Sequence, residues 1–346
     1  GTSQFNPCYL AQSFMLDDDS IQNSDVSVTD ILDAFTIGTN GSEFTPKSDA
    51  AIAALATTAG GDSFCLNFSN SGSLGLDSST LGNNYTPTSM DSTNQNTNTP
   101  SLAYPKISNI GTPSGDTAAN YTMGLGSNRM VYSGANQAAL GLISPTLIQP
   151  DDPKIYWEFY IEGGSVGGAS GGRLGNGIAV PQFNGGTGSG FYGAGGESAF
   201  FYRGTMYDNG ATSVSGFTTA PVGGIQQMAF EPSTGKVWIG VDGTWRNGAG
   251  TSGTTLDESN PDDQLTVQDY IFTMGANRST DIGVMNFGDN PTMSGNITAG
   301  GNADGNGHGN FKYAVPSGFL APNSANITAP SYQGIDYFAP TLYEGN

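Results

Sequence analysis

One serine of the sequence lies in a pattern that hydrolases use to hold a nucleophile. The run Gly168–Gly172 fits G-x-S-x-G around Ser170, and in such enzymes a sharp strand-to-helix turn exposes the serine hydroxyl. The chemistry also needs a histidine as base, and His308 is the only histidine of the chain. Glycines surround Ser170 and no helical pattern follows it. The pattern therefore favours a glycine-rich loop, and we expect no catalytic residue in this chain.

A second glycine pattern has the spacing of a dinucleotide-binding turn. The run Gly188–Gly193 fits G-x-G-x-x-G, which binds a pyrophosphate only where a strand leads into a helix. No helical pattern follows this run. We therefore interpret the match as a consequence of composition, and we expect no cofactor.

Two clusters carry the oxygen ligands that calcium prefers. They are Asp17–Asp19 and the run 302–306, in which Asp304 and Asn306 are the candidate ligands. Both clusters lack the distal glutamate of an EF-hand loop. Solvated loops are therefore the favoured interpretation, and we expect no metal.

The two cysteines, Cys8 and Cys65, leave two interpretations open. Two thiols alone do not make a metal site. They either form one disulfide that closes a long loop or are two small buried hydrophobic residues. The sequence does not show whether their Cβ atoms meet, so both interpretations stand.

The charge balance excludes one class of partner. Thirty acidic residues against ten basic ones give a net charge of −20. A field of this sign repels nucleic-acid phosphates and anionic membrane surfaces. No apolar run is long enough to span a bilayer. We therefore expect neither nucleic-acid binding nor membrane insertion.

The first part of the chain contains the predicted helices. Ser48 is placed to cap a helix over 49–58, and Gly60-Gly61 supplies a stop signal. A shorter helical pattern covers 28–35. A stretch rich in Ser, Thr and Asn follows from 69 to 105, and it is typical of an extended connector.

The rest of the chain reads as strands. In the run 155–162, Ile155, Trp157, Phe159 and Ile161 alternate with polar residues, so we expect one apolar face and the glutamates on the other. Further strands are predicted at 177–180, 199–203, 227–230, 236–241 and 282–287. This regular succession predicts two packed antiparallel sheets, with Ile155, Trp157, Phe159, Val237, Ile239 and Phe287 buried between them.

Several of these segments resemble the SPRY (B30.2-like) domain in the form found in virion and tail proteins of marine bacteriophages. The run 233–245 is similar to that family's Thr-Gly-Lys-x-Trp-x-Gly-x-Asn-Gly-x-Trp hairpin, with Asp242 in place of the usual Asn. The family's aromatic-Glu strand, its "GIA" strand and its closing strands are matched by Tyr156-Trp157-Glu158, Gly177-Ile178-Ala179, Asn286-Phe287-Gly288, 295–300 and 311–320. The resemblance covers about 61–346, and the first 60 residues match no family.

The expected fold class is mainly β, a SPRY-like antiparallel β-sandwich with a small, partly helical N-terminal segment and an extended linker. The predicted divisions are an N-terminal segment 1–60, a strand and connector 61–117, the sandwich 118–330 and a C-terminal extension 331–346.

The resemblance implies a non-enzymatic phage structural protein at the virion surface: a tail fibre, a receptor-binding component or a capsid decoration. Its implied partners are further copies of itself, other virion proteins and a host-surface glycan or protein. Two alternatives remain, namely a secreted or cell-surface carbohydrate-binding module and a filament or assembly subunit.

Binding by such sandwiches is expected in loops at the rim of the sheets, because loops vary without disturbing the core. The longest irregular connections are predicted at 181–198, 204–224, 246–264 and 288–310. Trp238 and Trp245 either stack on sugar rings at the surface or pack against a neighbouring loop. The candidate binding residues are Phe183, Phe191, Tyr192, Tyr207, Phe217, Trp245 and His308.

Overall fold

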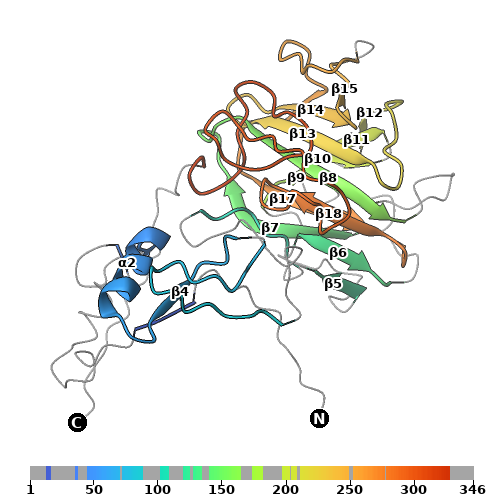
Figure 1. Ribbon diagram of the computed structural model, residues 1–346. Helices are drawn as coiled ribbons and strands as arrows, with labels where there is room; N and C mark the ends of the chain where they lie inside the picture. The colour runs from blue at the N-terminus through green and yellow to red at the C-terminus, as the bar shows by residue number, and fades with distance from the viewer. Residues whose placement is uncertain are drawn as a thin grey trace, which may run out of the picture.

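The computed structural model describes residues 13–16, 36–37, 45–70, 72–88, 102–108, 120–124, 128–134, 140–164, 174–181, 197–202, 204–208, 211–248, 252–276 and 278–327. The amino-terminal elements are β1 (Ser13–Met15), β2 (Thr36–Ile37), β3 (Thr45–Pro46), α2 (Asp49–Ala59) and β4 (Phe64–Leu66). In Figure 1, α2 and β4 lie beside the large β-structure rather than within it.

The first large sheet has six strands in the order β12-β11-β10-β9-β17-β7, and every pairing is antiparallel. Its strands are β7 (Leu140–Ile148), β9 (Gly175–Ala179), β10 (Ser198–Tyr202), β11 (Thr205–Asp208), β12 (Ala211–Val214) and β17 (Tyr270–Ala276). The segment 204–224, predicted to be irregular, therefore contains two strands, β11 and β12, and that prediction is wrong. Their short length and small polar residues hide them from a pattern search.

The second large sheet has eight strands. Seven follow the order β15-β14-β13-β8-β18-β6-β5, and β16 pairs with β14. The strands are β5 (Tyr121–Met123), β6 (Arg129–Tyr132), β8 (Ile155–Gly163), β13 (Ile225–Glu231), β14 (Lys236–Val241), β15 (Thr244–Trp245), β16 (Asp263–Gln264) and β18 (Ile282–Asn286). All these pairings are antiparallel as well.

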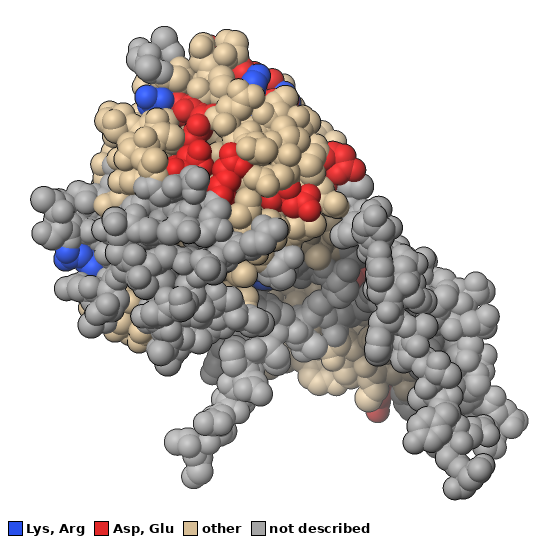
Figure 2. Space-filling view, turned by 180° about the vertical axis from the view of Figure 1, so that it is seen from behind, with Lys and Arg blue, Asp and Glu red and all other residues tan. Residues whose placement is uncertain are grey.

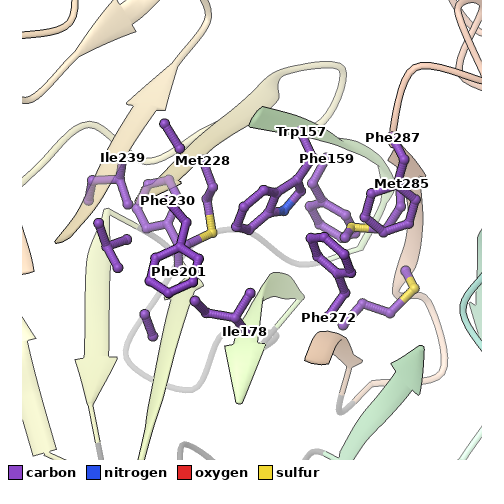
Figure 3. Close-up of a cluster of buried hydrophobic side chains, with 14 of the residues drawn as sticks. Trp157, Phe159, Ile178, Phe201, Met228, Phe230, Ile239, Phe272, Met285 and Phe287 are labelled. Atoms are coloured by element: carbon purple, nitrogen blue, oxygen red, sulfur yellow. The ribbon is translucent and has the colours of Figure 1, made fainter. Parts of the chain in front are cut away.

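Aromatic rings from both sheets meet in the core between them (Figure 3). Trp157 of β8 packs edge-on against Phe272 of β17, with ring centroids 5.2 Å apart. Phe272 also meets Phe287 at 4.7 Å. The residues predicted to lie between the sheets are all 0% exposed: Ile155, Trp157, Phe159, Val237, Ile239 and Phe287. The predicted antiparallel β-sandwich is therefore confirmed.

Two turns of the predicted hairpin region follow the expected chemistry. Gly235 takes a φ of 74° between β13 and β14, and its N–H donates to the Glu231 carbonyl over 2.8 Å. Between β14 and β15, Asp242 and Gly243 have φ of 48° and 81°. Positive φ at both central residues matches the twist of the flanking strands, and Asp tolerates it nearly as Asn does.

The helix α2 has the predicted caps. The Ser48 side chain accepts a hydrogen bond from Ala51 N, and Gly60 follows the last turn with a φ of 72°. Ile52 and Ala56 are buried against Cys65 of β4, and Leu55 packs beside them. The second predicted helix, over 28–35, lies outside the described residues. Within the described part of the chain, no helix has the length and apolarity needed to cross a membrane.

A segment without regular strands covers the outer face of the eight-stranded sheet. This closing segment, residues 288–327, is drawn in dark orange to red over β13 and β14 in Figure 1. Phe311 packs against Tyr156 of β8, and Phe319 packs against Trp238 of β14. The predicted connector contributes too, since Tyr104 and Ile107 belong to the same buried core.

Candidate binding face of the six-stranded sheet

An aromatic cluster lies on the outer face of the six-stranded sheet. In β10, Phe201 belongs to the core between the sheets, so its neighbours Phe200 and Tyr202 point to the outer face. Tyr207 of β11 stands opposite Phe200 in the strand register. The rings of Tyr202 and Tyr207 stack with centroids 5.9 Å apart and planes 29° apart.

The strand beside this cluster carries glycine at the positions that share its face. Gly177 of β9 stands opposite Phe200, and Gly175 lies two residues away. A Cβ added at Gly175 would lie 2.9 Å from Phe200 Cε1 and 2.9 Å from Tyr202 Cβ. The two side chains therefore occupy the space above bare backbone, which lets aromatic rings approach the sheet closely.

A buried hydroxyl lies at the same level of this face. Thr273 of β17 stands opposite Gly177, and its neighbour Phe272 points into the core, so Thr273 points outward. Thr273 is 1% exposed, and its Oγ1 makes no hydrogen bond within the described structure. A buried hydroxyl without a partner is unfavourable, and such groups are kept most readily where they serve a contact.

The edge of the sheet beside Tyr207 is open to solvent. Tyr207 pairs with Thr212 of β12, and Ala211, Thr212 and Ser213 are all exposed. Phe200 and Tyr202 are only 4% and 8% exposed, whereas Tyr207 is half-buried. The accessible part of the cluster is therefore its Tyr207 end, where an aromatic ring adjoins small polar side chains.

The electrostatic surroundings disfavour anionic ligands. On the face seen in Figure 2, acidic side chains gather in a band and basic ones are few. Glu197 leads into β10 and accepts hydrogen bonds from Gln268 Nε2 and from the Tyr270 hydroxyl. Burial, together with the nearby Glu197 charge, raises the pKa of Tyr270, so this phenol stays neutral.

The opposite outer face, on the eight-stranded sheet, is closed by a buried polar network. Glu158 of β8 is 0% exposed although its side chain points away from the apolar core. Its Oε1 accepts from the Tyr156 hydroxyl at 2.9 Å and from Tyr313 N at 2.8 Å. Its Oε2 accepts from Lys312 N at 2.9 Å and from Asn286 Nδ2 at 3.3 Å.

The position of Glu158 corrects an expectation. The alternation along β8 predicted a polar face bearing the glutamates, but only Glu162, paired with Arg129 at 2.5 Å, is partly exposed. Burial raises the pKa of Glu158, and the hydrogen bonds to the carboxylate act against this shift. The carboxylate thus fastens the closing segment to the sheet instead of facing water.

The structure separates the predicted binding residues. Tyr207 lies in the six-stranded sheet, whereas His308 lies in the closing segment over the other sheet. Phe217 is half-buried and packs toward Phe201, with ring centroids 6.4 Å apart. The residues Phe183, Phe191 and Tyr192 lie outside the described part of the chain.

The predicted surface role of Trp245 is wrong. Trp245 is 2% exposed and its ring lies 6.1 Å from that of Tyr156. Trp238 is 0% exposed and donates its indole N–H to the Asp257 carbonyl at 3.0 Å. Both tryptophans therefore pack against neighbouring segments, which was the other interpretation of the sequence. Strand alternation alone did not reveal the segment that covers this face.

The candidate calcium ligands have other roles. The Asp304 carboxylate is 7% exposed as a residue and accepts from the backbone N–H groups of Asn306, His308 and Ala321. It accepts a further bond from Asn326 Nδ2, and Asn306 Nδ2 donates to Asn326 Oδ1. These contacts shape the turn of the closing segment. Asp17–Asp19 lie outside the described residues.

The remaining candidates for chemistry are only partly visible. Ser170 and Gly188–Gly193 lie outside the described residues, as does Cys8. Cys65 is buried against α2, and its backbone N–H donates to Asp77 Oδ1. Among the residues that the structure does describe, no group of three or more His, Cys, Asp or Glu side chains is placed to hold a metal ion.

Comparison with known proteins gives structural neighbours but no sequence relatives. No protein-family model and no curated protein matches the chain. Similar solved structures include the SPRY domain of human HERC1, with a TM-score of 0.32, 10% identity, and coverage of 48% of this chain and 91% of that one. A second human SPRY domain has a TM-score of 0.32 and 14% identity, covering 48% and 94%. The carbohydrate-binding module CBM66 from Bacillus subtilis has a TM-score of 0.28 and 12% identity, covering 48% and 86%.

Proposed function

We propose that this chain is a non-enzymatic structural protein of a bacteriophage particle, in which a SPRY-like sandwich binds a neutral glycan or protein surface. The aromatic cluster of Phe200, Tyr202 and Tyr207 carries the proposal, because it joins aromatic rings, bare glycine backbone and a buried hydroxyl on one face. Its place in the particle, as tail fibre, receptor-binding or decoration protein, is supported by the sequence resemblance given above.

The composition of the face suits an uncharged ligand. A tyrosine ring offers apolar surface for a sugar ring or an apolar side chain, and its hydroxyl serves a polar neighbour. Thr212 and Ser213 add adaptable hydrogen-bonding groups at the exposed edge. The net charge of −20 opposes a sulfated or sialylated ligand. A neutral sugar is thus the preferred ligand class.

The test is binding of the purified chain to an array that carries neutral glycans beside sulfated and sialylated counterparts. We expect signal on neutral glycans, and a Tyr207→Ala variant should weaken it about tenfold, as for an aromatic contact worth ~1.4 kcal/mol. Tyr85→Ala is the matched control, since Tyr85 is 50% exposed but lies outside the sandwich. Unchanged binding by Tyr207→Ala would contradict the proposal.

The edge strand β12 favours a second candidate, a filament or assembly subunit. Its residues Ala211–Val214 carry no charge and no proline, the features that usually keep an edge strand from pairing with another chain. Thr212→Lys should then shift the chain to smaller species in analytical ultracentrifugation. A chain that sediments as a monomer before the change would exclude this candidate.

A further inference from the structure

One lysine, one asparagine and one aspartate meet where three parts of the sandwich come together. Lys106 lies in the segment 102–108, Asn128 precedes β6, and Asp289 follows β18. Lys106 Nζ contacts Asp289 Oδ2, across 183 residues of sequence. Asn128 Nδ2 lies 3.2 Å from Asp289 Oδ1 and 3.3 Å from Oδ2.

This ion pair differs from the others that the described residues form. The Asp289 side chain is 0% exposed, whereas the carboxylates that face Lys154 are 16% and 49% exposed. The neighbouring Gly288 is packed so tightly that an added Cβ would lie 3.0 Å from the Tyr104 ring and 3.3 Å from the Phe311 ring. The carboxyl group is thus held in a water-poor site against an amine.

The site also contains the groups that an acyl transfer needs. Burial raises the pKa of Asp289, although the Lys106 charge acts in the opposite direction. A proton can therefore pass from the ammonium of Lys106 to the carboxylate, which leaves a neutral amine and a carboxylic acid in contact. Asn128 is placed to donate to a negative charge that develops on an Asp289 oxygen.

We propose that Lys106 and Asp289 join in an intramolecular isopeptide bond. The Nζ lone pair forms a bond to Cγ of Asp289, and the carbonyl electrons move to the oxygen that faces Asn128. When the carbonyl re-forms, the C–O bond to the hydroxyl breaks and the hydroxyl leaves with a proton from nitrogen. One C–N bond is formed, one C–O bond is broken, and one water molecule is released, with no oxidant or reductant.

Two physical factors favour the condensation. The fold holds amine and carboxyl in contact, so their reaction has the high effective concentration of an intramolecular step. Burial of the acid opposes the return of water for hydrolysis. The bond would link the segment 102–108 covalently to the start of the closing segment, which suits a protein exposed to mechanical or chemical stress.

The test is the intact mass of the purified full chain under denaturing conditions. We expect it to be one water molecule lighter than the sequence mass, and a protease digest should yield one branched peptide that contains Lys106 and Asp289. Lys106→Arg keeps the positive charge but lacks the amine nucleophile, so its mass should equal its own sequence mass. Lys154→Arg changes the exposed pair with Glu258 and should leave the loss of water in place.

The outcomes separate this proposal from its neighbours. A wild-type mass equal to the sequence mass identifies a simple ion pair and overturns the proposal. A loss of ammonia instead of water makes Asn128 the acyl donor and overturns the assignment to Asp289. A loss of water that persists in Lys106→Arg places the dehydration elsewhere in the chain and has the same consequence. None of these results depends on whether the sandwich binds a glycan.

Discussion

The two outer faces of the sandwich are finished in different ways. On the eight-stranded sheet, the closing segment covers Tyr156, Trp238 and Glu158, and the buried carboxylate accepts four hydrogen bonds. On the six-stranded sheet, aromatic rings lie over glycine backbone, and the Thr273 hydroxyl is buried without a hydrogen bond. One face is saturated with internal contacts and the other is not.

The difference indicates a division of labour between the faces. A fully satisfied polar network fixes one arrangement of the segments that it joins, because each buried group loses its partner if the arrangement changes. A face with an unmet polar group and adaptable side chains at its edge is better suited to a contact with another molecule. We therefore expect substitutions on the first face to change stability and substitutions on the second to change binding.

Glu158→Ala should have the largest effect on stability. The change leaves the N–H groups of Lys312 and Tyr313 without their acceptor, together with the Tyr156 hydroxyl. We expect a loss of about 4 kcal/mol in the free energy of unfolding, since each orphaned buried donor costs ~1–3 kcal/mol. Urea denaturation measures it.

Glu162→Ala is the matched control for this change. Glu162 lies on the same strand and pairs with Arg129 at a partly exposed position. An exposed pair contributes about 0–1 kcal/mol, so the control should lose far less stability than Glu158→Ala. Equal losses from the two variants would show that the network does not hold the closing segment.

A smaller effect should appear in the pH dependence of Glu158→Gln. Burial raises the pKa of Glu158, so the folded protein holds this proton more tightly than the unfolded chain does. That contribution is complete below the ordinary Glu pKa of about 4.3 and is lost as the pH rises through the folded-state pKa. Glutamine has nearly the same shape and does not titrate.

The expected outcome is therefore a falling difference. The stability of the wild type relative to Glu158→Gln should be greatest in acid and decrease toward neutral pH. Urea denaturation of both proteins across this range measures the difference at each pH. A difference that stays constant or rises with pH would mean that the buried carboxylate is stabilised more by its hydrogen bonds than it is destabilised by burial.

Local sequence signals predicted the elements of the fold. The alternation around Trp157 predicted β8 and its core face, and Ser48 with Gly60 marked both ends of α2. These features depend on residues that are close in sequence, where backbone preference and periodicity act directly. The turn at Asp242 and Gly243 is a further case.

The sequence did not predict which faces are covered. Glu158 reads as an outward polar residue, and its burial depends on Lys312, which is 154 residues away. The aromatic face had a usable signal, because Phe200, Phe201 and Tyr202 place aromatic residues on both sides of β10. Aromatic residues on both sides of a strand indicate that both sides are covered, which period-two alternation by itself does not show.

The smallest expected effect on stability belongs to Thr273→Val, and it addresses the open face directly. Valine has nearly the same shape as threonine and replaces a buried hydroxyl that makes no hydrogen bond in the described structure. We expect a change of stability between about 0 and +1 kcal/mol, because no hydrogen bond is lost. Thr234→Val is the contrasting control, since the Thr234 hydroxyl donates to Glu231 Oε2 at 2.6 Å and its loss should cost about 1 kcal/mol. Weaker glycan binding by Thr273→Val at unchanged stability would assign the hydroxyl to the ligand. A destabilisation as large as that of Thr234→Val would show instead that the hydroxyl has an internal partner, and the contrast between the two faces would disappear.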